Sequence, residues 1–225
     1  MKITNKWIFV LSLMLLMIGW CAKTSKNVLL TGNINNNMVV SSLSGVSEQE
    51  EKWLIQMREE EKLARDVYKK LWEKWGNQVF INIAQSEQTH TDAIKILLDR
   101  YMIKDPVVDD TVWSFTSLEI KKLYEDLVVQ WNKSLLDAFI VWATIEDLDI
   151  NDLNKLTHET NNEDIKFVYN NLNKGSRNHI NAFVKNIINN GGSYAPKYIS
   201  QTEYDEILLS QQGNNWNWNW NWNKR

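Results

Sequence analysis

Apolar side chains recur at intervals of three and four residues through most of the chain between residues 47 and 190. This spacing is typical of amphipathic helices, because residues three or four apart lie on one helix face. The first helix is expected to begin at Ser47, which can form a capping box with Glu50, and to end near Gly76. Its predicted inward face combines apolar residues with one glutamate: Leu54, Met57, Glu61, Ala64, Tyr68 and Leu71.

Three further long helices are predicted at about residues 78–101, 134–148 and 162–189. A further turn can extend the helix at 134–148 to Leu156. Gly175 is expected to interrupt the last helix, at a cost of about 1 kcal/mol relative to alanine. A shorter helix at about 116–131 is expected within the connection between the second and third long helices. Because strand patterns are nearly absent, the sequence predicts an all-α fold, a four-helix bundle with a long crossover.

Residues 1–21 have the composition of an export leader. Lys2 and Lys6 precede an apolar run over residues 7–20, which is too short for a comfortable transmembrane helix. Cys21 lies where a lipoprotein signal places its lipidated cysteine, although Trp20 replaces the small residue usual before it. Lipidation of Cys21, ordinary signal cleavage and an uncleaved amphipathic anchor remain open. All three predict an extracytoplasmic protein, secreted or membrane-anchored as a lipoprotein.

Polar segments without a helical pattern flank the helical domain, which is expected over residues 47–190. Residues 22–46 are rich in Ser, Asn, Thr and Gly and are interpreted as a flexible tether, and residues 191–225 as a C-terminal tail. In this tail tryptophan alternates with asparagine, at Trp216, Trp218, Trp220 and Trp222. In an extended chain this period places all four indoles on one side, which suits stacking on sugars or insertion at a membrane interface. A terminus without a selected role is the simpler alternative.

Charge and cysteine content exclude several classes of protein. The formal net charge is −3, and it becomes −5 without Lys2 and Lys6. With no basic excess and no zinc-knuckle spacing, nothing favours nucleic-acid binding. The single cysteine excludes an intramolecular disulfide.

One short motif carries the clearest chemical signal. Glu87 and His90 lie three residues apart, so both side chains leave the same helix face, which is otherwise apolar. Burying a carboxylate and an imidazole is costly unless a partner compensates. A metal ion is such a partner, and Glu-x-x-His is a recurrent ligand pair of di-metal helix bundles. The inward faces of the other three long helices add further candidate ligands, namely Glu61, Glu146 and His179.

Other interpretations of these residues remain open. Glu61 can simply pair with an arginine, and His179 can be a hydrogen-bonded core histidine. Residues expected beside the site are Tyr68 and Tyr169, as redox or hydrogen-bonding neighbours or only as packing residues, and Arg65 and Arg177, as partners that hold the carboxylates.

The remaining polar residues are expected outside the site. Glu59 and Glu60 fall off the inward stripe and should be solvated, and His158 should lie in a surface turn. Asp147 and Asp149 are expected to be exposed or to cap, although Asp149 lies one turn from Glu146 and can substitute as a ligand.

The di-metal template requires a second Glu-x-x-His, but Ser176 stands three residues before His179. A di-metal site completed by water or Asp149, a single-metal site, and a site held only by hydrogen bonds are all compatible with this sequence.

Four segments resemble a known family. They are residues 57–68, residues 80–90 with Ser86-Glu87-Gln88-Thr89-His90, residues 145–150, and Gly175-Ser176-Arg177-Asn178-His179. Over about residues 48–190 the chain resembles the ferritin-like family catalogued as domain of unknown function 2202. The resemblance implies a ferritin-like four-helix bundle, often in secreted or surface-attached bacterial and archaeal proteins, without a settled activity. It also implies that the missing carboxylate at Ser176 is a family trait.

The leading functional hypothesis is binding of iron, or of manganese, inside the bundle. Fe(II) oxidation, or reduction of oxygen or peroxide, would be the associated reaction, with Glu87 or Glu61 as the bridging ligand. The rival is a non-catalytic, surface-tethered helical module whose buried polar network needs no metal. Expected partners are a metal ion, a membrane through the lipid anchor or signal segment, and a second copy in a homodimer. Whether the protein is an enzyme stays open.

Overall fold

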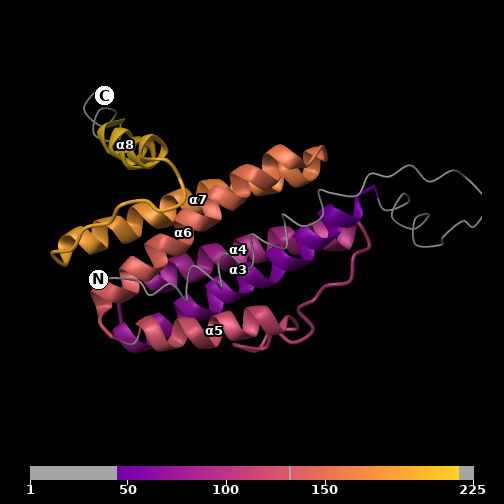
Figure 1. The fold of residues 1–225 in the computed structure, drawn as a ribbon, viewed down its shortest axis with the longest axis horizontal. Helices are drawn as coiled ribbons and strands as arrows, with labels where there is room; N and C mark the ends of the chain where they lie inside the picture. The colour runs from indigo at the N-terminus through magenta and orange to yellow at the C-terminus, as the bar shows by residue number, and fades with distance from the viewer. Residues whose placement is uncertain (1–44, 132, 218–225) are drawn as a thin grey trace, which may run out of the picture. The chain divides into compact units, whose positions relative to one another are not determined.

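The structure is a computed structural model that describes residues 45–131 and 133–217. Within these residues there are six helices and no strands (Figure 1). The helices are α3 (Glu48–Trp75), α4 (Gln78–Arg100), α5 (Leu118–Trp131), α6 (Leu135–Glu159), α7 (Glu163–Asn189) and α8 (Gln201–Asn217). The all-α prediction is confirmed for this part of the chain. The predicted leader with Cys21, nearly all of the tether, and Trp218, Trp220 and Trp222 lie outside the described residues.

Local signals set the helix ends. The Ser47 side chain accepts the N–H of Glu50, and the Glu50 carboxylate accepts the N–H of Ser47 at 2.8 Å, so the predicted capping box forms. Gly76 ends α3 with a φ of 62°, a left-handed conformation that glycine adopts without strain. Helix α6 extends to Glu159, past the predicted end at residue 148 and through the further turn to Leu156 that the sequence allowed, because Leu153 and Leu156 continue its buried stripe.

The long helices associate as two antiparallel pairs. Helix α3 packs along α4, and α6 packs along α7, while α4 contacts α7 (Figure 1). Helix α5 packs against α3 and α6, and α8 contacts α7. None of the described helices is long and apolar enough to cross a membrane.

Residues 101–117 and α5 cover a second face of helix α3, on which Glu59 lies. The expectation that Glu59 is solvated is therefore wrong: the Glu59 carboxylate is buried and accepts the backbone N–H groups of Thr116 and Ser117. Glu60 is half-buried rather than exposed. A single inward stripe was too simple a description, because this helix contacts neighbours on both sides.

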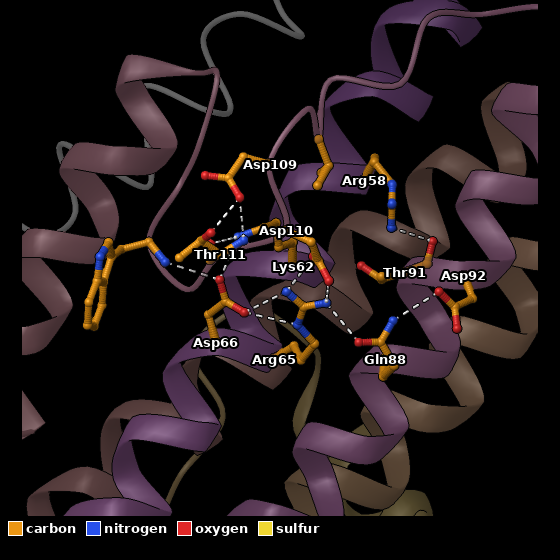
Figure 2. A network of polar contacts seen from close by, with 12 residues as sticks. Arg58, Lys62, Arg65, Asp66, Gln88, Thr91, Asp92, Asp109, Asp110 and Thr111 are labelled. Atoms are coloured by element: carbon orange, nitrogen blue, oxygen red, sulfur yellow. Dashed lines mark hydrogen bonds and ion pairs between the residues drawn. The ribbon is translucent and has the colours of Figure 1, made fainter.

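An ionic network ties the connection to this second face of α3 (Figure 2). Arg65 donates to Asp66 at 2.7 Å and to Asp110 at 2.8 Å. Lys62 donates to Asp66 at 2.6 Å and to the carbonyl of Thr111 at 2.9 Å. Because Lys62, Arg65 and Asp66 are almost fully buried, each charge depends on these partners.

Helix α8 occupies part of the segment for which the sequence pattern predicts only a tail. The buried carboxylate of Asp147 accepts the backbone N–H groups of Lys197, Tyr198 and Ile199, which lead into α8. Asp147 was expected to be exposed or at a helix cap. It is fully buried instead, because it binds a backbone segment about fifty residues further along the chain.

Candidate metal centre

Four helices bring the predicted ligands together in the interior. Helix α3 contributes Glu61, α4 contributes Glu87 and His90, α6 contributes Glu146, and α7 contributes His179. All five are buried. The three-residue spacing of Glu87 and His90 places both on the face of α4 that packs toward its neighbours.

Glu87 lies between the two histidines. One of its carboxylate oxygens is 2.8 Å from Nδ1 of His90, and the other is 3.0 Å from Nδ1 of His179. Glu61 approaches the same nitrogen of His90 at 3.2 Å, and Glu146 approaches that of His179 at 3.4 Å. Two groups of possible ligands result, Glu61–Glu87–His90 and Glu87–Glu146–His179, and within each group the ligand atoms lie within 4.8 Å of one another. They share Glu87.

Both ring nitrogens of His179 have polar neighbours. Its Nε2 lies 2.9 Å from the hydroxyl of Ser86, a contact that fixes the orientation of the ring. Its Nδ1 is buried and lies between two carboxylate oxygens, 3.0 Å from Glu87 and 3.4 Å from Glu146, without a hydrogen bond of good geometry to either. A cation among these three atoms would use the nitrogen and both oxygens, so the residues present fit a metal ion.

His90 depends on a close approach of α7. A Cβ atom at Gly175 would lie 2.3 Å from Nε2 of His90 and 2.4 Å from Cε1. Only glycine leaves room for the ring at this position. The prediction that Gly175 interrupts the helix is wrong, because α7 runs continuously from Glu163 to Asn189.

The pKa values in the site are set mainly by pairing between the two imidazoles and the carboxylates that face them. Burial alone would lower the pKa of both imidazoles, but the facing carboxylates raise the pKa of His90 to about 11 and that of His179 to about 10. Burial favours the neutral form of Glu87 as well, yet His179 and His90 hold the pKa of this carboxyl well below its usual range. For Glu61, burial prevails and raises the pKa to about 8. A cation would therefore replace protons on imidazole rather than enter a neutral cavity.

Two further side chains complete the surroundings. The hydroxyl of Tyr68 donates to Glu146, so Tyr68 lies next to one of the candidate ligands. Ser176 donates to Asp149, which stands one turn beyond Glu146 on α6. Burial raises the pKa of Asp149 well above its usual range, and the nearby carboxylates of Glu61 and Glu146 raise it further. Asp149 is therefore close to the ligand groups, and neither an exposed residue nor a helix cap.

The other predicted neighbours lie elsewhere. Arg65 pairs with Asp66 and Asp110 instead of a site carboxylate, because α3 turns it toward the connection. Arg177 donates to Asn173 and Glu203, and so binds α8. Tyr169 is buried, and its hydroxyl has no partner among the described residues. His158 is exposed, as predicted, but it lies in the last turn of α6 and not in a connecting turn.

The sequence interpretation missed the roles of Ser86 and Gly175. A signal existed for both. Ser86 directly precedes Glu87 and lies one helical turn before His90. An isolated glycine inside a helical pattern often marks a close approach, and Gly175 faces the histidine of the neighbouring helix.

Comparison with known proteins gives a family and no activity. Residues 50–211 match the family described as an uncharacterized protein domain, DUF2202. A protein of Methanocaldococcus jannaschii named uncharacterized protein MJ0754 is 57% identical over 165 residues, which are 73% of this chain and 89% of that protein. A crystal structure titled as hypothetical protein MJ0754 is similar with a TM-score of 0.70 at 52% identity, covering 81% of this chain and 98% of the solved one.

Proposed function

Because the chain belongs to the DUF2202 family, whose description assigns no activity, we propose a function from its own residues: it binds two metal ions, iron or manganese, in a carboxylate–histidine centre. The observation that carries the proposal is the buried carboxylate of Glu87, which lies between Nδ1 of His90 and Nδ1 of His179 and belongs to both ligand groups. A cation in either group would replace the protons that otherwise pair these imidazoles with the carboxylates.

The ligand types favour these metals. Carboxylate oxygens suit hard cations such as iron and manganese, imidazole suits iron, and the two groups contain no thiolate. Glu61, Glu87 and His90 would hold one ion, and Glu87, Glu146 and His179 would hold the other. Asp149 is the nearby carboxylate that compensates for Ser176. The pairing of α3 with α4 and of α6 with α7 supports placing the centre in a ferritin-like four-helix bundle with a long crossover through α5.

The associated chemistry is oxidation of Fe(II) or reduction of oxygen or peroxide, for which the metal would supply the redox centre when bound. The protein's own residues orient and insulate the centre. Ser86 fixes the ring of His179, and Tyr68 fixes the carboxylate of Glu146. Buried aromatic rings next to Tyr68, those of Trp142 and Phe183, separate this side of the centre from water.

Anaerobic titration of the full chain with Fe(II) or Mn(II) tests the proposal, with bound metal measured by elemental analysis. We expect the wild type to bind close to two equivalents, and Glu87→Gln and His179→Ala to lose most of this binding. His158→Ala is the matched control, because it removes an exposed histidine and should bind as the wild type does. A folded wild type that takes up neither metal would refute the proposal, and so would equal binding by Glu87→Gln.

A metal-free helical module is the second candidate. The hydrogen bonds of Tyr68 to Glu146 and of Ser86 to His179 favour it, because they already satisfy part of the buried network. In that case the titration would show no uptake, while His179→Ala would still destabilise the fold.

We also propose that the protein acts outside the cytoplasm, attached to a membrane through a lipid on Cys21. The support is the leader-like composition of residues 1–21. Mass spectrometry of the protein recovered from membranes of an expressing bacterium should show acylated Cys21, and Cys21→Ser should move the protein to the soluble fraction. An unmodified, soluble wild type would exclude lipidation.

A further inference from the structure

A line of tyrosine and tryptophan rings leads from the candidate metal centre to the surface. The ring of Tyr68 is 4.6 Å from that of Trp142, measured between centroids. Trp142 is 6.1 Å from Trp131, Trp131 is 6.3 Å from Tyr124, and Tyr124 is 6.2 Å from Trp113. These separations lie in the range of neighbouring aromatic pairs in proteins. The line crosses from α3 to α6, then to α5, and ends in the connection before α5.

Burial decreases steadily along this line. Tyr68 is 0% exposed, Trp142 1%, Trp131 3% and Tyr124 7%, whereas Trp113 is 51% exposed. Only the last ring is therefore accessible to a molecule in solution. The four inner rings are shielded from water and from diffusing reactants.

Both ends of the line are held in place. At the inner end, the hydroxyl of Tyr68 donates to Glu146, one of the candidate ligands. At the outer end, the backbone N–H of Trp113 donates to Asp66 at 3.3 Å, and Nζ of Lys70 lies 4.9 Å from its ring centroid. Trp113 also has a φ of 63°, a conformation that a tryptophan rarely adopts.

The chemical type of the rings changes on the other side of Tyr68. There it contacts Phe183, which contacts Phe80 and Phe139. Phenylalanine gives up an electron far less readily than tyrosine or tryptophan, so this phenylalanine cluster is a poor route for charge. Among the described ring contacts of Tyr68, the oxidisable rings lead only toward Trp113.

We propose that Tyr68, Trp142, Trp131, Tyr124 and Trp113 carry single electrons between the surface and the candidate metal centre. The role of this path in a reaction rests on the proposed metal centre, whereas electron transfer between the five rings does not require a bound metal. Reduction of one hydrogen peroxide to two waters at the centre consumes two electrons and two protons. An external one-electron reductant supplies the electrons one at a time at Trp113, and the protons come from solvent.

Each electron passes inward by the same elementary exchange. When Tyr68 is oxidised, it loses one electron to the oxidant, and its phenol proton moves along the hydrogen bond to Glu146. Trp142 then returns an electron to Tyr68, which takes its proton back. The electron deficit thus moves outward ring by ring until the reductant fills it at Trp113.

Electron transfer along the line can be tested in the metal-free full chain by oxidising its outermost ring, Trp113, with light. A ruthenium photosensitiser is attached to Ser114→Cys, next to Trp113, in a Cys21→Ser background. After a flash and oxidative quenching, the sensitiser takes an electron from Trp113. In a Tyr124→Trp background, which leaves Tyr68 as the one tyrosine among the five positions of the line, we expect a tyrosyl radical, detected by electron paramagnetic resonance and transient absorption, that disappears in Tyr68→Phe.

Trp131→Phe is the decisive variant, because it keeps an aromatic ring for packing but removes an oxidisable one. We expect it to abolish the Tyr68 radical, whereas Trp53→Phe should leave it unchanged, since Trp53 is equally a buried tryptophan but lies off the line. Absence of the radical in the wild type, its survival in Trp131→Phe, or an equal loss in Trp53→Phe would overturn the proposal. If the wild type forms the radical but takes up neither metal in the anaerobic titration, the metal centre is refuted and the proposed electron path still stands.

Discussion

Replacing Gly175 with alanine tests how closely α7 approaches His90. The new Cβ would lie 2.3 and 2.4 Å from two atoms of the imidazole, and its three nearest neighbours all belong to that ring. The ring cannot remain where it is. Moving it away would break its 3.2 Å contact with Glu61 and its 2.8 Å contact with Glu87.

Two opposite effects determine the sign of the change in stability. Alanine is favoured over glycine inside a helix by roughly 1 kcal/mol. Against this, overpacking costs about 1–3 kcal/mol and a broken buried hydrogen bond about 1–3 kcal/mol. The clash prevails, so we expect Gly175→Ala to lower the free energy of unfolding by roughly 1–5 kcal/mol. In a domain of this size, each kcal/mol lowers the melting temperature by about 2–4 °C.

The assay is denaturant unfolding of the metal-free protein, carried out as a double-mutant cycle with His90→Ala. In the His90→Ala background the ring is absent, so the same Gly175→Ala change should stabilise the protein by about 0.5–1 kcal/mol. This reversal of sign is the critical result. Stabilisation in both backgrounds would show that the ring does not pack on Gly175, and equal destabilisation in both would assign the clash to another group.

Three further outcomes are expected. Tyr68→Phe should destabilise the fold by about 1–3 kcal/mol, because it removes the hydroxyl that donates to the buried carboxylate of Glu146. Tyr169→Phe is the control and should be nearly neutral, because the Tyr169 hydroxyl has no hydrogen-bond partner among the described residues. Thermal unfolding measures both, and equal effects would contradict this reasoning. Asp147→Asn should speed amide exchange at residues 197–199 and in α8, since it weakens three charge-assisted bonds, and unchanged exchange would refute that role. Metal binding at pH 7 should release protons from both His90 and His179, because their pKa values are raised to about 11 and about 10. The metal affinity should therefore rise as the pH increases from 7 toward these pKa values. Calorimetry in buffers of different ionisation enthalpy measures the proton release, and binding without it would contradict the prediction.

Much of the helical architecture could be predicted because its signals are local. The capping box of Ser47 and Glu50, the glycine at residue 76 and the repeating apolar positions all act within a few residues of one another. The same periodicity places Glu61, Glu87, Glu146 and His179 on inward faces, so their convergence follows once the helices pack. These features needed no knowledge of distant contacts.

The errors arose where a residue depends on a distant segment. Glu59 and Arg65 lie on a second face of α3, and only the covering connection makes that face buried. Likewise α8 has few apolar residues, with Tyr204 and Ile207 buried, and the turn before it is held by Asp147. Helical periodicity alone contains no information about such long-range partners.

The shared position of Glu87 makes the two ligand groups unequal. A chain cut within residues 101–117 would leave the first fragment, with α3 and α4, in possession of the complete group Glu61–Glu87–His90. The second fragment would hold Glu146 and His179 but lack their shared carboxylate. The first fragment would thus keep a complete candidate ligand group, whereas the second would depend on α4 for Glu87.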